Sequence, residues 1–398
     1  MHSCTPGSTV TYYPVNETSI NIAKGGSITG ANAILVRRAT ANTQGYARAY
    51  IDNYGTIIGT DGDAIYADPA NSQIINVNNY QSGTITGGIY GPVRFLNNTG
   101  EIDGGARSAA ASTFDMIVNN SGTIISNGAP ATLSSTGPLT ISNTEEGVIG
   151  GSATAISAEG PISLTNEGTI NGSVVVLGAN GLSNSIDTRK GTINGNVMFS
   201  NGRDTLYARF DPATGRTSSI TGSIDGGAGI DTISFDVSSD ITLAQTVLPT
   251  NFERLGLNLS NDATVTIADG FNASSGIIVS GSGYSGGVIN DASFNTSGTA
   301  VTVDSLGLSF ENVGTIAATP DGWSSYAVNV ESAINSGTIT GSYGGGLISK
   351  ALNNSGTIRA DNVGANVRGK LTNSGSIISN STTLKGGATL FLTILTLV

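Results

Sequence analysis

The sequence has very few of the residues from which most catalytic and metal sites are made. It contains one histidine, His2, and one cysteine, Cys4, among 398 residues. A Ser-His-Asp or Cys-His nucleophile needs a histidine beside the reactive side chain, and a structural zinc site needs several thiolates or imidazoles. The sequence therefore excludes triad-type hydrolases on the body of the chain, zinc sites of the cysteine or histidine type, and an internal disulfide framework.

Charged and aromatic residues are also scarce, at 11% and 6% of the chain, and there is one tryptophan. The formal charge of −11 predicts repulsion from phosphate backbones and anionic membrane surfaces, so no nucleic-acid partner is expected. Only 10 residues are proline, and Ile, Val and Leu recur at regular intervals, which argues against disorder. We expect a folded chain built mainly from small side chains, since 56 residues are glycine.

One short phrase is repeated along most of the chain. "NNSGTI" occurs at Asn119–Ile124 and again at Asn353–Ile358, with near-copies such as "DNYGTI", "TNEGTI" and "INSGTI" elsewhere. Successive glycines of this phrase lie 17 to 29 residues apart up to Gly191 and 19 to 23 residues apart from Gly314 onward. Periods near 20 residues are typical of solenoids, and a variable step indicates loops that absorb insertions.

The repeat predicts an all-β fold, a right-handed parallel β-helix formed as a single-stranded solenoid. Gly, Asn, Ser and Thr at this density are poor helix formers. Each repeat has about three short apolar clusters, which predicts three strands per coil, and stacked coils would pair strands in parallel about 4.8 Å apart. At roughly 22 residues per coil the chain would hold about 18 coils.

The Gly and Asn of the phrase are predicted to form its corner. Glycine would supply the positive φ of a tight turn, and asparagine tolerates the left-handed region better than other residues. Stacked asparagine side chains can also bond to one another as a ladder. The ladder is predicted at Asn53, Asn98, Asn120, Asn166, Asn312, Asn335, Asn354 and Asn373.

The chain divides into three predicted parts. Residues 1–24, with a "TYYP" segment, are expected to cap the solenoid, because an open sheet edge invites pairing. Residues 25–387 are expected to form the β-helix, with an irregular section of longer loops at about 197–310. The apolar run 388–398 is too short for a membrane helix and is interpreted as a last strand, or alternatively as a membrane-strand or docking segment.

One stretch in the irregular section resembles a calcium-binding turn. "GGAGIDTI" at Gly226–Ile233 matches the nonapeptide of calcium-binding β-rolls, in which glycine-turn carbonyls and an aspartate supply oxygen ligands. Its metal candidates are Gly227, Gly229 and Asp231. The alternative is an ordinary glycine-rich corner, since the nearest related stretch, "NGRDTL", lies 27 residues earlier and not nine or eighteen. Apart from this calcium, no cofactor is predicted.

Taken together, the "NNSGTI" corners, the isolated "GGAGIDT" and the phrase "NFERLGLNLSNDATVTIADG" at Asn251–Gly270 resemble the passenger region of repetitive, adhesin-like autotransporters of Gram-negative bacteria. The start "SCTPGSTVT" is similar to the first mature residues of such passengers. The resemblance implies a passenger at the cell surface or secreted across the outer membrane, with the signal peptide and the translocator barrel outside this chain, because the chain opens on a polar run and ends at Val398.

The function predicted on this basis is a non-catalytic adhesin or structural stalk, not itself membrane-embedded. Its partners would be a host-cell, matrix or carbohydrate surface, or other copies along the helix or at its ends. One alternative is a β-helical polysaccharide lyase or hydrolase that uses Asp and Arg on the coil surface. Its candidate residues are Asp61, Asp63 and Asp68 in one cluster and Arg203, Asp204, Arg209 and Asp211 in another. The other alternative is a calcium-dependent secreted structural protein.

Overall fold

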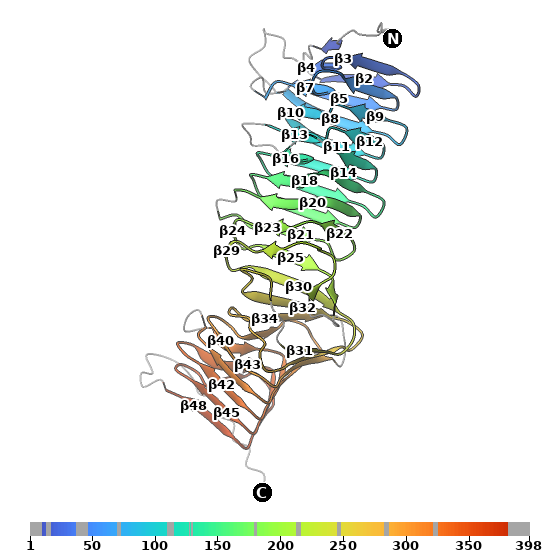
Figure 1. The fold of residues 1–398 in the computed structure, drawn as a ribbon. Coiled ribbons are helices and arrows are strands. Elements are labelled where there is room, and N and C mark those ends of the chain that lie inside the picture. The colour runs from blue at the N-terminus through green and yellow to red at the C-terminus, as the bar shows by residue number, and fades with distance from the viewer. Residues whose placement is uncertain are drawn as a thin grey trace. The chain divides into compact units, whose positions relative to one another are not determined.

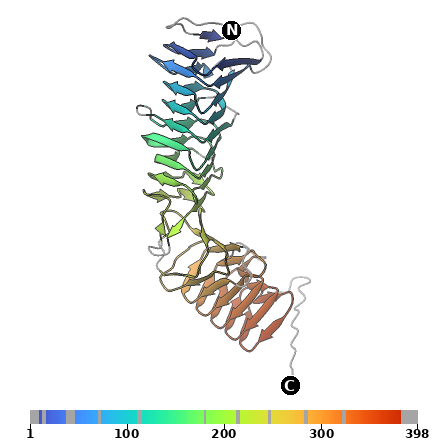
Figure 2. The same cartoon turned by 90° about the vertical axis from the view of Figure 1, so that its right-hand side faces the viewer.

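The computed structural model describes most of the chain. The described residues are 10–12, 17–36, 47–69, 73–109, 115–126, 128, 130–178, 181–211, 216–244, 248–281, 286–320 and 325–380. In these ranges the regular structure consists of β-strands without an α-helix, and no helix there is long and apolar enough to cross a membrane. The fold comprises two units, each drawn in Figures 1 and 2.

Unit 1 comprises residues 1–209, 218–231 and 249–251. One face of its coils is a parallel sheet to which every coil contributes one strand. In stacking order the strands are β2 (Glu17–Ile22), β5 (Ala47–Asn53), β8 (Gln73–Asn79), β11 (Val93–Asn98), β14 (Met116–Asn120), β17 (Leu139–Asn143), β19 (Ile162–Asn166), β21 (Ser185–Asp187) and β25 (Thr205–Ala208).

Two further columns of strands complete the coils of unit 1, so each coil has three sides. The column that follows the "NNSGTI" corner contains β3 (Ser27–Gly30), β6 (Thr56–Gly59), β9 (Thr84–Thr86), β12 (Glu101–Asp103), β15 (Thr123–Ile125) and β22 (Thr192–Asn194). The other contains β1 (Val10–Tyr12), β4 (Ile34–Val36), β7 (Ile65–Ala67), β10 (Ile89–Gly91), β13 (Ala106–Ser108), β16 (Leu133–Ser135), β23 (Val197–Met198) and β28 (Ile224–Asp225). The long strands β18 (Val148–Ala158) and β20 (Thr169–Val176) run through both columns, and β24 (Asn201–Gly202) pairs with β29 (Ala228–Gly229).

Unit 2 comprises residues 210–217, 232–248 and 252–398 and has the same three-sided construction. Its first sheet contains β30 (Thr232–Val237), β32 (Arg254–Leu259), β34 (Ile277–Gly281), β37 (Val301–Val303), β40 (Tyr326–Asn329), β43 (Gly345–Ser349) and β46 (Ala365–Val367). Its second contains β31 (Ile241–Leu243), β33 (Thr264–Ile267), β35 (Gly287–Asn290), β38 (Ser309–Asn312), β41 (Ser332–Asn335), β44 (Ala351–Asn354) and β47 (Leu371–Asn373). Its third contains β36 (Ser293–Thr296), β39 (Thr315–Ala318), β42 (Thr338–Gly341), β45 (Thr357–Ala360) and β48 (Ser376–Ser379), while β26 (Phe210–Asp211) and β27 (Arg216–Thr217) form an antiparallel pair.

The predicted parallel β-helix with three short strands per coil is confirmed, but the predicted number of coils is too high. Among the described residues, the first sheet has nine strands in unit 1 and seven in unit 2, one strand per coil, compared with the expected 18 or so coils. The step between successive coils varies around the assumed 22 residues, from 31 between Ile20 and Ile51 to 18 between Leu347 and Ala365. Strand β2 lies inside the predicted cap at 1–24, and the apolar run 388–398 lies outside the described residues.

Stacked aliphatic side chains form the core. The isoleucine of each "GTI" element lies in register with its equivalents above and below and is fully buried, as at Ile57, Ile85, Ile102, Ile124, Ile149, Ile170 and Ile193. Burying such a side chain contributes roughly 1.5 to 3 kcal/mol relative to leaving it in water. The aliphatic columns therefore hold successive coils together along the axis.

A buried ladder of asparagine side chains lies beside this core, as predicted. In unit 1 the Nδ2 of each asparagine donates to the Oδ1 of the next at 2.8 Å, through Asn53, Asn79, Asn98, Asn120, Asn143 and Asn166. In unit 2 an equivalent ladder at 2.7 Å joins the buried Asn290, Asn312, Asn335 and Asn354 to Asn373, which is exposed. Asn79, Asn143 and Asn290 are additional to the predicted members.

One prediction about the repeated phrase is wrong: its glycine and asparagine are not there to supply a positive φ. Positive φ occurs at other glycines, such as Gly88 and Gly105, and not at the glycines that follow the ladder asparagines or at the asparagines themselves. A Cβ on Gly122 would overlap the carbonyl oxygen of Gly100 in the preceding coil. Glycine is required because the corners of neighbouring coils stack too closely for a side chain, and asparagine is required for its ladder hydrogen bonds.

Replacing a ladder asparagine is expected to destabilise unit 1 more than replacing the residue before it. Asn120→Ala removes one acceptor of the Asn98 side-chain amide, the donor to the buried side-chain carbonyl of Asn143 and the hydrogen bonds of Asn120 to main-chain carbonyl oxygens, so we expect a loss of about 2 to 4 kcal/mol. Asn119 bonds to Asn97 on the exposed side, and Asn119→Ala is expected to cost about 0.5 kcal/mol or less. Urea denaturation followed by circular dichroism measures both, and equal losses would contradict the role of the buried ladder.

Candidate functional site

Some of the Asp and Arg residues predicted as catalytic candidates take part in structural contacts, and others do not. In the first cluster, Asp63 forms an ion pair with Arg107, with 2.7 Å between carboxylate and guanidinium. In the second, Asp204 is only 1% exposed, whereas Arg203 on the other side of the backbone is exposed. The guanidinium of Arg209 donates hydrogen bonds to main-chain carbonyl oxygens of the preceding coil. Asp61 is exposed, Asp68 is half-buried, and Asp211 lies on β26 in unit 2.

The predicted calcium residues lie in a tightly stacked corner. Gly227 has a φ of 85°, and a Cβ there would overlap the carbonyl oxygen of Ser200 in the preceding coil. Gly229 pairs with Gly202, and a Cβ on it would overlap the Gly202 carbonyl oxygen. The side chain of Asp231 is fully buried and accepts a hydrogen bond of 2.7 Å from the backbone N–H of Asp204. Asp231 therefore has a structural role, whether or not calcium binds.

This role continues a pattern of acceptors along one corner of unit 1. The first N–H of β14 and that of β17 donate to the carbonyl oxygens of Pro138 and Pro161 in the next coil. From β19 onward, side chains replace the proline carbonyls. The N–H of Ile162 donates to Asn184 Oδ1, and the N–H of Asn184 donates to Asp204 Oδ1. The sequence shows these polar residues, but only the stacking shows that each one caps a strand of the preceding coil.

Besides Asp231, this corner contains the carboxylate of Asp204, whose charged form is electrostatically unfavourable. Burial raises the pKa of Asp204 and outweighs the backbone and side-chain hydrogen bonds from Asn184, which lower it. Its Oδ2 is buried and has no hydrogen-bond partner among the described residues. The nearby Asp231 carboxyl adds no compensating positive charge, so a charged Asp204 destabilises the folded state at neutral pH.

A column of aromatic and charged side chains lies on the outer face of unit 1. The rings of Tyr66 and Tyr90, on β7 and β10, are stacked with centroids 5.5 Å apart. The guanidinium of Arg107, on β13, lies 5.2 Å from the Tyr90 ring and also pairs with Asp63. These tyrosines are scattered in the sequence, and the coil spacing brings them together. The Tyr90 ring lies between Tyr66 and Arg107, so its hydroxyl group and ring edge are what it offers to a partner.

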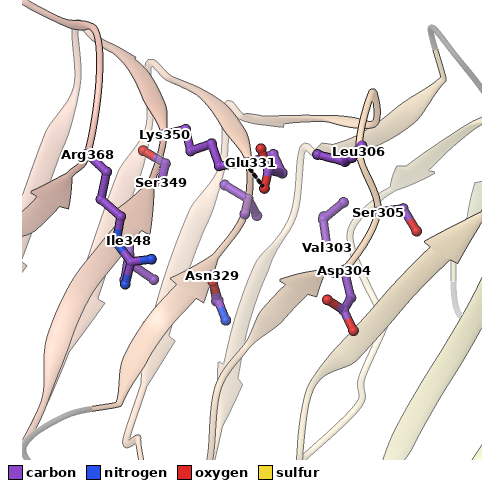
Figure 3. Close-up of a pocket in the computed structure, with 11 residues that line it drawn as sticks. Val303, Asp304, Ser305, Leu306, Asn329, Glu331, Ile348, Ser349, Lys350 and Arg368 are labelled. Atoms are coloured by element: carbon purple, nitrogen blue, oxygen red, sulfur yellow. Dashed lines mark ion pairs between the residues drawn. The ribbon is translucent and has the colours of Figure 1, made fainter.

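Unit 2 has a hollow of about 370 Å³ that crosses several coils (Figure 3). It lies at the corner after strands β37, β40, β43 and β46, and Leu306, which is 75% exposed, lies at one side of it. Its volume is near the lower end of the range for small-molecule sites. Sequence analysis did not single out any residue of this hollow.

Four charged residues of the hollow form one column, which we name the charge column: Asp304, Glu331, Lys350 and Arg368. Asp304, Lys350 and Arg368 each directly follow a strand of the first sheet, and Glu331 is the second residue after β40. Continuing the pairing of those strands places the four at the same register position in successive coils. The inner two form an ion pair of 2.8 Å. Within the described residues, neither Asp304 nor Arg368 has a side-chain partner, so the column presents a negative charge at one end and a positive charge at the other.

No protein-family model, curated protein or solved structure matches the chain. In the described part of the chain, three or more His, Cys, Asp or Glu side chains do not come together in a group that could hold a metal ion. The resemblance to autotransporter passengers and the calcium site therefore stay predictions.

Relative to the wild type, the variant Asp204→Asn is expected to become more stable as the pH rises. The raised pKa means that the folded protein binds this proton more tightly than the unfolded chain, so its stability falls as pH increases from about 4 through the folded pKa. Asp204→Asn removes this fall, and its amide oxygen can still accept the hydrogen bonds from Asn184. Melting temperatures from pH 4 upward should show the variant gaining on the wild type. Asp204→Ala, which leaves the amide groups of Asn184 without an acceptor, should be destabilised throughout.

The calcium prediction can be tested on the same corner. If the site binds calcium, added CaCl₂ should raise the melting temperature of the wild type in comparison with a chelator, and Asp231→Asn should abolish the rise. The variant is a matched control because an amide oxygen can still accept the hydrogen bond from Asp204. An identical melt in calcium and in chelator would leave Asp231 with its structural role alone.

Proposed function

We propose that this chain is a non-catalytic autotransporter passenger, displayed on a Gram-negative cell or secreted from it, that acts as an adhesin or a structural stalk. The observation that carries the proposal is the coil-on-coil stacking, in which the aliphatic columns and asparagine ladders are buried and columns of polar side chains face outward. Such a scaffold is preorganised, so a partner that contacts it does not have to order a flexible surface.

The outward columns support binding that is spread over many contacts. The outer residues of unit 1 include a second, partly exposed ladder in which Asn78, Asn97 and Asn119 are joined by hydrogen bonds of 2.8 Å. The column of Tyr66, Tyr90 and Arg107 on unit 1 and the charge column on unit 2 add other side chains at the same coil spacing. Individually weak contacts that repeat along a rigid support combine through high effective concentration. The partners proposed are host-cell, matrix or carbohydrate surfaces, or other copies of the chain.

One observation favours the alternative of a polysaccharide-cleaving enzyme enough to include it in the test. Asp304 and Glu331 occupy the same register position in neighbouring coils, about 4.8 Å apart along the axis, and Arg368 lies in the same hollow. Glycosidases work with a pair of carboxyl groups, and Asp304 and Glu331 are the acidic residues that line this hollow. The ion pair between Glu331 and Lys350 opposes this role, because it occupies one of the two carboxylates.

The proposal predicts attachment without turnover. Beads coated with the full chain should bind cultured epithelial cells or immobilised matrix proteins more than beads coated with an unrelated protein of equal negative charge. The chain incubated with pectin, alginate and related polymers should release no reducing ends and no unsaturated products. Product release that is lost in Asp304→Asn would overturn the proposal in favour of the enzyme, and beads that attach to nothing would remove the adhesin role.

A further inference from the structure

The charge column of unit 2 separates its charges by sign along the axis. In stacking order its residues are acidic, acidic, basic and basic, one per coil. The central ion pair neutralises Glu331 and Lys350, with side-chain exposures of 31% and 61%. The two free charges, on Asp304 and Arg368, are three coils apart, or about 14 Å along the axis. A matching ligand carries a positive and a negative group separated by about this distance.

An extended polypeptide has this spacing. A β-strand rises about 3.3 Å per residue, so side chains four positions apart lie on the same side at about 13 Å. The part of the hollow between the two free charges is suited to such a segment. It includes the half-buried aliphatic side chain of Ile348, which can pack against an apolar side chain, and Asn329, whose amide can bond to a peptide group. The exposed Leu306, beside Asp304 at one end of the hollow, adds a further apolar contact.

The same lining is less suited to a sugar chain. Sugar rings pack their apolar faces on aromatic rings, and the residues that line this hollow include none. A polymer with negative charges only would contact Arg368 but would be repelled by Asp304 and by the overall charge of −11. Charge complementarity therefore favours a ligand with both signs.

We propose that the charge column binds an extended peptide segment of a partner protein, one that carries a basic and an acidic residue four positions apart. Arg368 pairs with the acidic side chain, Asp304 pairs with the basic side chain, and the aliphatic residues between them hold the intervening segment. The inference rests on the proposed function in that it names the partner class for one part of an adhesive surface.

Binding of short labelled peptides to the full chain tests this inference. Fluorescence anisotropy is measured with the probe Gly-Ser-Lys-Val-Thr-Val-Glu-Gly-Ser and with a neutral analogue in which Gln replaces both charged residues. The charged probe should bind saturably and more tightly, and the difference should shrink between about 0.05 M and about 0.5 M NaCl as the charges are screened. Saturable binding that is equal for the two peptides, or none for either, would overturn the proposal.

Variants locate the binding. Arg368→Gln and Asp304→Asn should each weaken the charged probe by about threefold, the effect of an exposed ion pair, and leave the neutral peptide unaffected. Arg359→Gln, an exposed arginine of β45 in the same unit and outside the hollow, is the matched control and should change neither affinity. A similar loss in Arg359→Gln would show non-specific attraction and would contradict the assigned site.

Two further outcomes distinguish this inference from an acidic-sugar site and from the proposed adhesive function. If oligogalacturonate binds more tightly than the charged peptide, and if Arg368→Gln weakens that binding while Asp304→Asn does not, the ligand of the hollow is an acidic sugar and the peptide proposal is wrong. Peptide binding can succeed when beads fail to attach to cells, and cell attachment can survive in Arg368→Gln. The hollow and the proposed adhesive function can therefore fail independently.

Discussion

The structure depends on one constraint, which is that every coil must pair in parallel with the coils before and after it at a single close spacing. This pairing places residues of equal register in columns, so each column must consist of side chains that tolerate copies of themselves or of similar residues about 4.8 Å away. Aliphatic side chains meet this condition inside the coil, and asparagine meets it at the corner because its amide donates to the next carbonyl. Glycine meets it where a Cβ would overlap the neighbouring backbone.

The same constraint explains the irregular part of unit 1. Where the corner no longer provides a proline carbonyl, the strand N–H of each coil still needs an acceptor, and Asn184, Asp204 and Asp231 provide it from the next coil. The cost is a pair of buried carboxyl groups, one of which has its pKa raised by burial. Glycines that pack directly on the preceding coil complete this corner. A motif that resembles a calcium turn in the sequence thus has a sufficient structural reason to be present.

Function in a solenoid of this kind is expected to lie on its outer columns, because the interior is filled by packing. Stacking aligns Tyr66, Tyr90 and Arg107 on unit 1 and the four members of the charge column on unit 2. Neither set is a deep pocket, and each repeats at the coil spacing. Such surfaces suit extended or polymeric partners, which can contact several coils at once, better than compact small molecules.

The sequence by itself determined the fold class, the three strands per coil and the corner ladder, because these follow from short local patterns that recur. It did not determine the conformation of the corner glycines, the number of coils or the surface columns. Members of the charge column are 27, 19 and 18 residues apart (304 to 331, 331 to 350 and 350 to 368), and no fixed period relates them. Loop insertions change the step from coil to coil, so only the three-dimensional pairing decides which distant residues share a register and act together.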